Sequence, residues 1–256
     1  MPLTTPLVLF MGGNGHCTAR LERIRDALDT QTQPPFVLRE VHYPGFEGRP
    51  KADSFDGFLD ATADHIAALD DGPTPAWIHA TGIGGLLALT LRARGRLLDH
   101  PMMFQAPVLW GLENRRFPKL MRFGPARATL QWLFAQGAFQ RWFVRRQFET
   151  PISDTMRTAF FEGYAQCSAM ADFFTWLTPG LLRQLEEAFA KHPERLDKIV
   201  MLWGGQDAVV TLEELQISER ALGHQFERRT FDDWGHYPLI DAPQSWVKAV
   251  ANEVTP

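Results

Sequence analysis

Two segments of the chain carry side chains that move protons, and a third is a glycine-rich turn. Asp207 closes the segment WGGQD, and His236 lies within DWGHYP. Imidazole and carboxylate groups are the side chains that most often act as general acids and bases. The turn ATGIGG has Gly82 at its third position and offers no thiol or carboxylate for attack on a substrate. Each of these three segments follows a predicted strand.

The elements that carry these segments alternate in type. Short apolar runs are separated by longer segments of helical period, which predicts βα units and a mainly parallel sheet. The predicted strands span 7–10, 36 to about 42, 76–79, 101–104, 199–203 and 225–231. The predicted helices include 20–28 and 55–69, one that runs from the turn through Leu91, and one that begins near Pro243. Another opens at Thr211, which has capping-box spacing with Glu214.

The pattern changes between residues 111 and 193, where no convincing strand is found. This stretch carries about half of the aromatic residues of the chain. It reads as several helices broken at prolines, namely Pro118, Pro125, Pro151 and Pro179. We therefore predict a core formed by 1–110 and 194–256, with a helical cap, 111–193, inserted between two strands.

The three segments, in this order along the chain, resemble the α/β-hydrolase superfamily, including its serine hydrolases and thioesterases. In that family the nucleophile lies on a strand-to-helix turn written G-x-S-x-G, and the acid and the histidine follow. FMGG after the first strand resembles the oxyanion loop of the family, with Met11 in the usual histidine place. YPGFEGR resembles the Pro-Gly turn after the next strand. The resemblance implies an α/β fold whose mainly parallel sheet is flanked by helices. The leading antiparallel hairpin of the family is expected to be absent.

The resemblance places glycine where the nucleophile belongs. The turn of the family needs small residues two before and two after the nucleophile, and Ala80 and Gly84 occupy those places around Gly82. A nucleophile at Thr81 would put His79 and Ile83 at the crowded positions instead. Glycine adopts the strained backbone of this turn at little steric cost. The turn should persist, but no acyl- or alkyl-enzyme can form at residue 82.

The remaining site residues also take their roles from the resemblance. Asp207 would orient His236 and stabilise its cation. The backbone amides of Gly13 and Ile83 would form the oxyanion hole, which does not depend on side chains. Such a site without its nucleophile retains a residual rate over water.

Four other residues have both a chemical and a structural interpretation. Cys17 could replace the nucleophile, but a small buried hydrophobe at a helix start is favoured. The side chain of Thr81 should point away from the site. His16 could reach the mouth of the pocket, although a solvent-facing or capping histidine is favoured. His79, on a strand buried on both faces, is expected to be structural.

The first part of the cap is locally basic. Eight basic residues lie between 111 and 150 against two acidic residues, Glu113 and Glu149. The basic residues are Arg115, Arg116, Lys119, Arg122, Arg127, Arg141, Arg145 and Arg146. A solvated helix face is the default interpretation. A patch that accepts an anionic substrate group, such as the phosphates of an acyl thioester, is the functional one. The aromatic residues of the cap would line a pocket for a bulky apolar or ring-containing substrate.

Composition restricts the partners. The net charge is -4 and gives no indication of nucleic acid. Two cysteines suit a reducing compartment. The start of the chain lacks the basic region of a secretory signal, and no apolar run is long enough for a bilayer. We expect a cytoplasmic protein with a small-molecule substrate. No metal-ligand spacing or nucleotide loop is found, so no metal or other cofactor is expected.

Several functions remain open at this point. The first is a general-base enzyme that acts on a bulky apolar or acyl substrate, hydrolytically or not, with an Asp-His dyad and an oxyanion hole but no serine. The second is a non-catalytic, ligand-binding pseudo-hydrolase. The third is an esterase or thioesterase inactivated by a Ser-to-Gly change, and the YPG turn resembles type II thioesterases. A structural role has no sequence feature of its own.

Overall fold

The computed structural model of the protein describes residues 5–148 and 151–255. Six strands form one sheet in the order β2-β1-β3-β4-β5-β6, and all five neighbouring pairs run parallel. The strands are β1 (Leu7–Met11), β2 (Val37–Glu40), β3 (Trp77–Thr81), β4 (Met102–Gln105), β5 (Ile199–Gly204) and β6 (Glu227–Phe231). The predicted α/β architecture with a mainly parallel sheet is confirmed.

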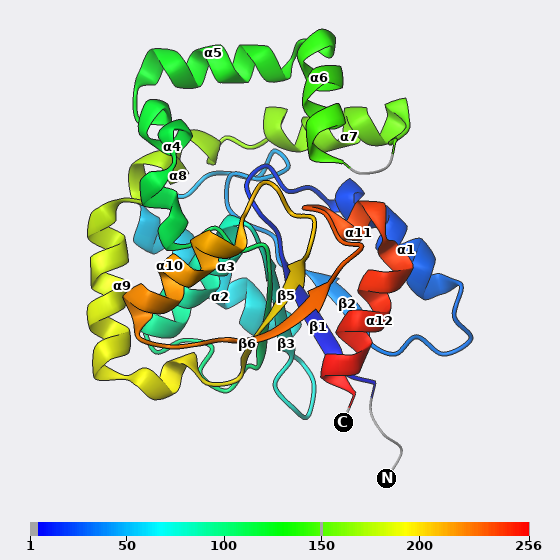
Figure 1. The fold of residues 1–256 in the computed structure, drawn as a ribbon, viewed down its shortest axis with the longest axis vertical. Coiled ribbons are helices and arrows are strands. Elements are labelled where there is room, and N and C mark those ends of the chain that lie inside the picture. Colours follow the sequence, from blue (N-terminus) through cyan, green and yellow to red (C-terminus); the bar gives the residue numbers. More distant parts are fainter. Residues whose placement is uncertain (1–4, 149–150, 256) are drawn as a thin grey trace.

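Helices cover both faces of the sheet (Figure 1). One layer contains α1 (Glu22–Asp29), α11 (Pro238–Asp241) and α12 (Pro243–Val254), which pack on one another. The other contains α2 (Phe55–Leu69), α3 (Ile83–Ala93), α9 (Pro179–Lys191) and α10 (Leu212–Leu222). Short 3-10 helices η1 (Thr18–Leu21), η2 (Trp110–Asn114) and η3 (Pro193–Leu196) join elements. The helix predicted at 20–28 is therefore two elements, η1 and α1.

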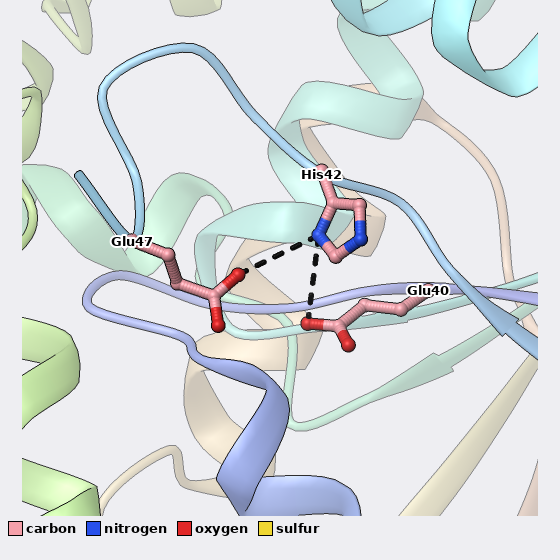
Figure 2. A group of neighbouring side chains, drawn as sticks. All are labelled: Glu40, His42 and Glu47. Carbon is pink, nitrogen blue, oxygen red and sulfur yellow. Dashed lines mark ion pairs between the residues drawn. The ribbon is translucent and has the colours of Figure 1, made fainter. Parts of the chain in front are cut away.

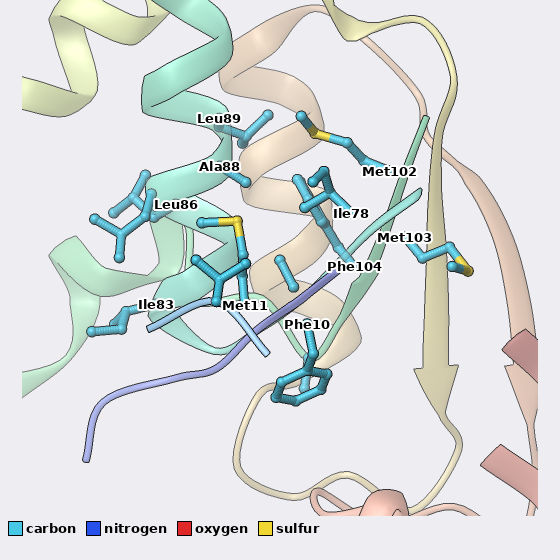
Figure 3. Close-up of a cluster of buried hydrophobic side chains, with 14 of the residues drawn as sticks. Phe10, Met11, Ile78, Ile83, Leu86, Ala88, Leu89, Met102, Met103 and Phe104 are labelled. Carbon is cyan, nitrogen blue, oxygen red and sulfur yellow. The ribbon is translucent and has the colours of Figure 1, made fainter. Parts of the chain in front are cut away.

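The core lies between the sheet and these helices. Figure 3 shows side chains from β1, β3, β4 and α3 gathered in one buried cluster. β4 and β5 are buried at every position, as expected for central parallel strands with helices on both faces. The predicted capping box of Thr211 and Glu214 is present at the start of α10.

Five further helices lie between β4 and β5 in the sequence. They are α4 (Arg116–Met121), α5 (Gly124–Phe134), α6 (Gly137–Gln147), α7 (Asp154–Ala165) and α8 (Met170–Trp176). In Figure 1, α5, α6 and α7 lie at the opposite end of the molecule from the end of α12. The prediction that prolines break these helices was wrong for Pro118, which lies within α4. At Pro125 and Pro179 the helices are separated as predicted, and both prolines lie in the first turns of α5 and α9. Proline is favourable there because the first helical amides need no partner within the helix.

The assignment of 111–193 to a cap stays a prediction. α9 falls within that range, yet it contacts α3 and α10, which lie beside the sheet. Within the described residues, no helix is long and apolar enough to cross a membrane.

The strand order reverses direction at β1, since β2 lies on one side of it and β3 on the other. Ligands bind beyond the carboxyl ends of the strands at such a point.

Candidate active site

The turn between β3 and α3 has the geometry of a strained elbow. Gly82 has φ +54° and ψ −126°, a conformation that residues with a side chain rarely adopt. A Cβ on Gly84 would lie 2.5 Å from the carbonyl oxygen of Met11 and 2.7 Å from that of Gly12. The need for glycine at 84 is therefore set by the loop after β1, which passes close to the start of α3.

Gly82 itself has room for a side chain. A Cβ there would meet no atom closer than the Cα of Gly13, at 3.5 Å, which is ordinary van der Waals contact. Its carbonyl oxygen accepts hydrogen bonds from the amides of Val108 and Gly85. The turn is held in place without any contribution from a side chain at 82.

Asp207 and His236 lie against each other. The Nδ1 atom of His236 is 3.0 Å from Oδ2 of Asp207, whose side chain is only 1% exposed. The other carboxylate oxygen accepts hydrogen bonds from the amides of Val209, at 2.8 Å, and Val210, at 2.9 Å. An ionised carboxylate only accepts, so the proton of the neutral imidazole lies on Nδ1. Nε2 is then left as a base.

Two glycines at the end of β5 allow the acid and histidine loops to meet. A Cβ on Gly204 would lie 2.5 Å from the carbonyl oxygen of Trp234. The amide of Gly205 donates to the carbonyl oxygen of Phe231 at 2.8 Å, and that of Gln206 to Trp234 at 3.0 Å. These bonds fix the loop that carries the histidine next to the loop that carries its acid.

Gln105, at the end of β4, positions His236 and was missed in the sequence. Its Nε2 donates to the backbone carbonyl oxygen of His236 at 3.3 Å, and its Oε1 accepts from Nε1 of Trp246 at 3.0 Å. The three residues are far apart in the sequence, so no local pattern indicates this link.

The amides assigned to the oxyanion hole lie on adjacent loops. A Cβ built on Gly13 would be 3.9 Å from the amide nitrogen of Ile83 and 3.7 Å from the Cα of Gly82. Among the described residues, no acceptor is hydrogen-bonded to either amide. Their role in stabilising an oxyanion stays a prediction.

A cavity of about 170 Å³ brings most of the predicted site residues together. Gly13, Gly82, Ile83 and His236 all line it, and Asp207 stands behind the imidazole. The other lining residues are Phe10, Asn14, His16, Arg20, Thr81, Gln105, Ala106, Val108, Arg115, Tyr164, Val209, Val210, Tyr237 and Leu239. The cavity lies at the carboxyl ends of β1, β3 and β4.

The favoured interpretation of His16, a solvent-facing or capping histidine, was wrong, whereas the alternative that it reaches the pocket is confirmed. It is only 5% exposed, lines the cavity, and its Nε2 lies 2.8 Å from Oε1 of Glu40. Burial lowers the pKa of His16, although the neighbouring Glu40 opposes the effect. A Cβ on Gly12 would overlap the His16 ring, so glycine at 12 is what allows the ring to turn inward.

Two structural interpretations are confirmed. His79 is fully buried and stacks on Phe10, with 5.4 Å between ring centres. Burial lowers its pKa to about 3, so it is neutral at ordinary pH. Cys17 is buried, and its thiol contacts the carbonyl oxygen of Ala159. Burial raises the pKa of Cys17, which opposes its use as a nucleophile.

The described basic residues of the predicted cap do not converge on the cavity. Of those that the structure describes, only Arg115 lines it, and Arg115 is held by both carboxylate oxygens of Glu214, at 2.7 and 2.5 Å. Arg141 and Arg145 are exposed on α6. Glu149 and the side chains of Glu113 and Arg146 lie outside what the structure describes.

One group of residues has the types and spacing of metal ligands. Glu40, His42 and Glu47 bring possible ligand atoms within 4.8 Å of one another (Figure 2). The oxygens of Glu40 already pair with His16 and Arg25, and those of Glu47 with the amide of Thr18 and with Arg49. Two guanidinium groups neutralise these carboxylates, so a cation would have to displace them. We interpret the group as an ion-pair cluster.

Comparisons with known proteins agree with the fold and identify the family. A family model described as the alpha/beta hydrolase family matches residues 10–250. A loop variant of the haloalkane dehalogenase DbeA from Bradyrhizobium elkanii is 18% identical with a TM-score of 0.72, covering 98% of this chain and 89% of its own. An epoxide hydrolase from Bacillus megaterium is 12% identical with a TM-score of 0.69, covering 99% and 94%. At these identities the likeness concerns the fold. No curated protein matches significantly.

Proposed function

The chain belongs to the alpha/beta hydrolase family, and we propose that it acts on a small substrate by general-base catalysis, without a covalent intermediate at residue 82. One observation carries the proposal. The 3.0 Å contact between His236 and Asp207 is intact and lies beside Gly82 in one cavity. A general base needs this geometry, whereas a nucleophile needs a side chain that position 82 lacks.

In a hydrolytic reaction the base acts on water. Nε2 of His236 takes a proton from a water molecule as its oxygen attacks the substrate carbonyl carbon. Asp207 stabilises the resulting imidazolium, and the amides of Gly13 and Ile83 donate to the oxyanion. The imidazolium returns its proton to the leaving group. In a non-hydrolytic reaction the same Nε2 takes a proton from carbon next to the carbonyl, and the amides hold the enolate.

The size of the cavity restricts the substrate. An engineered cavity of about 150 Å³ in another protein holds benzene, so about 170 Å³ accepts roughly one ring or a short acyl group. Val108, Val210 and Leu239 contribute apolar contacts. A bulkier substrate, such as an acyl thioester, would place only its reacting end inside.

The test uses two reactions that depend on a base in different ways. Hydrolysis of small aryl esters and aryl thioesters is followed by absorbance. Exchange of the α-hydrogen of a small aryl ketone for deuterium is followed by NMR in D₂O. We expect saturable activity in at least one of them, lowered by roughly 10²–10⁴ in His236→Ala, with no acylated protein by mass spectrometry.

The Gly82→Ser variant separates the alternatives. If only this variant hydrolyses esters and becomes acylated, and the unsubstituted protein is inactive in both reactions, the protein is an esterase whose nucleophile is missing. If the unsubstituted protein and His236→Ala bind small aryl ligands equally and neither turns over a substrate, the cavity serves binding alone. Either result contradicts general-base catalysis.

A further inference from the structure

Arg20 is a buried cation on the wall of the cavity. It lies in η1, and only 5% of its surface is exposed. Its guanidinium carbon lies 4.0 Å from the ring centre of Phe160 and 4.9 Å from that of Tyr164, both on α7. These aromatic faces attract the cation, but they accept no hydrogen bond in the plane of the guanidinium. Its N–H groups therefore still need hydrogen-bond acceptors.

The hydrogen-bonding groups of Arg20 are incompletely satisfied. The guanidinium has five N–H donors. Nη2 donates to the carbonyl oxygen of Phe160 at 2.9 Å, and Nη1 makes a long contact of 3.5 Å with that of Asn14. Nε is buried and has no partner. Within residues 5–148 and 151–255, no carboxylate forms an ion pair with Arg20. A buried charge without an anion is costly, so a partner from outside is expected.

The neighbouring groups do not supply this anion. Burial lowers the pKa of His16, and an imidazole is not an anion in either of its ordinary protonation states. Glu40, the carboxylate beyond it, is engaged by His16 and by Arg25 at 3.2 Å. The second arginine on the cavity wall, Arg115, shows the opposite arrangement, since Glu214 binds it through both oxygens. Among the described residues that line the cavity, Arg20 is therefore the cation whose charge remains for a ligand.

We propose that the cavity binds a small carboxylate, whose anionic group pairs with Arg20 while the rest of the molecule lies beside Gly82 and His236. A guanidinium matches the planar geometry of a carboxylate, and such charge-assisted bonds are strong. About 170 Å³ leaves room for roughly one ring besides that group. A carboxylate would be the substrate class of the proposed function, and that part of the inference rests on the proposed function. The binding of the carboxylate at Arg20 does not, because binding requires no turnover.

A purely structural role for Arg20 is the competing interpretation. Its bond to the carbonyl oxygen of Phe160 joins the loop after β1 to α7 and stabilises that contact. This role uses one strong hydrogen bond and leaves Nε buried without a partner. It predicts a loss of stability on substitution but no preference for charged ligands.

Binding of matched probes tests the proposal. Benzoate and benzamide have nearly the same shape and differ in charge, and their affinities are measured by calorimetry at neutral pH. We expect benzoate to bind the unsubstituted protein at least about tenfold more tightly, the effect of one charge-assisted hydrogen bond. Arg20→Met should remove this preference. Arg20→Lys should retain part of it. Arg228→Met, an exposed arginine on β6, removes the same charge and should leave the preference unchanged.

Each result has a defined meaning. Equal affinities for the two probes in the unsubstituted protein would overturn the inference even if Arg20→Met does not fold. A preference that survives in folded Arg20→Met would also overturn it. Tighter binding of phenyl phosphate than of benzoate would replace the carboxylate by a phosphate. His236→Ala should keep the preference for benzoate. An unsubstituted protein that prefers benzoate but turns over no substrate, or turnover that survives unchanged in His236→Ala, would therefore contradict the proposed function alone.

Discussion

Two histidine–carboxylate pairs reach the same cavity, and they are built differently. In one, His236 lies 3.0 Å from Asp207, which also accepts two backbone amides. In the other, His16 lies 2.8 Å from Glu40, which also binds Arg25. The side chain of His236 is 13% exposed, whereas that of His16 is 6% exposed.

The difference shows that a short contact alone does not define a catalytic dyad. His236 keeps Asp207 at Nδ1, which leaves Nε2 as its free basic nitrogen in the cavity that Gly82 also lines. His16 uses Nε2 on Glu40, and burial, with a smaller contribution from Arg20, lowers its pKa. We interpret the first pair as one arranged to take up a proton. The second pair joins the loop after β1 to the end of β2.

The largest expected effect comes from removing each histidine in the Gly82→Ser background. His236→Ala should lower kcat/KM for a small aryl ester by roughly 10³, because the serine loses its base. His16→Gln can still donate to Glu40 and should stay within about tenfold. Comparable losses in both variants would mean that the two pairs share the chemistry.

Next in size are the carboxylates. Glu40→Gln should lower the free energy of unfolding by about 3 kcal/mol, because Arg25, His16 and the neighbouring His42 lose a buried charged partner. Asp207→Asn should mainly lower activity, since the wrong tautomer of His236 is then favoured. Urea unfolding and esterase assays on both variants check that Glu40→Gln mainly lowers stability and Asp207→Asn mainly lowers activity. A lower stability of Asp207→Asn than of Glu40→Gln would contradict this difference between the two pairs.

Per pH unit, a smaller effect is expected from His79, a buried histidine that has no carboxylate partner among the described residues. Its pKa falls from about 6.5 in the unfolded chain to about 3 in the fold. The unfolded state thus binds the proton first, and stability decreases as the pH falls from about 6.5 toward 3. His79→Phe should flatten this decrease by up to about 1.4 kcal/mol per pH unit. Urea midpoints at several pH values measure it, and equal slopes would contradict it.

The smallest effect should come from Arg25, the outer partner of Glu40. Its side chain is 40% exposed and its Nη2 lies 3.2 Å from the carboxylate. Because water screens such a contact, Arg25→Met should cost less than about 1 kcal/mol in urea unfolding. A loss as large as that of Glu40→Gln would show that the guanidinium, and not His16, holds the carboxylate.

Local sequence patterns predicted much of the fold. The helix at 55–69 has the bounds that its periodicity predicts, and all six strands form within one or two residues of their predicted ends. The glycines of the elbow and of WGGQD also follow from local rules, because backbone strain and close approach exclude a Cβ there. Pro118 was misread, since a proline is tolerated in the first turn of a helix as well as between helices.

The order of the three segments and the residue types within them determined the family, the dyad of Asp207 and His236, and the absence of a nucleophile at Gly82. Only the tertiary structure decided that His16 turns inward, that Gln105 holds the histidine loop, and that Arg20 is a buried cation. The guanidinium of Arg20 donates a hydrogen bond to the carbonyl oxygen of Phe160, 140 residues away. Burial of this kind depends on contacts between distant segments, whereas sequence periodicity reports only what each segment does within its own helix or strand.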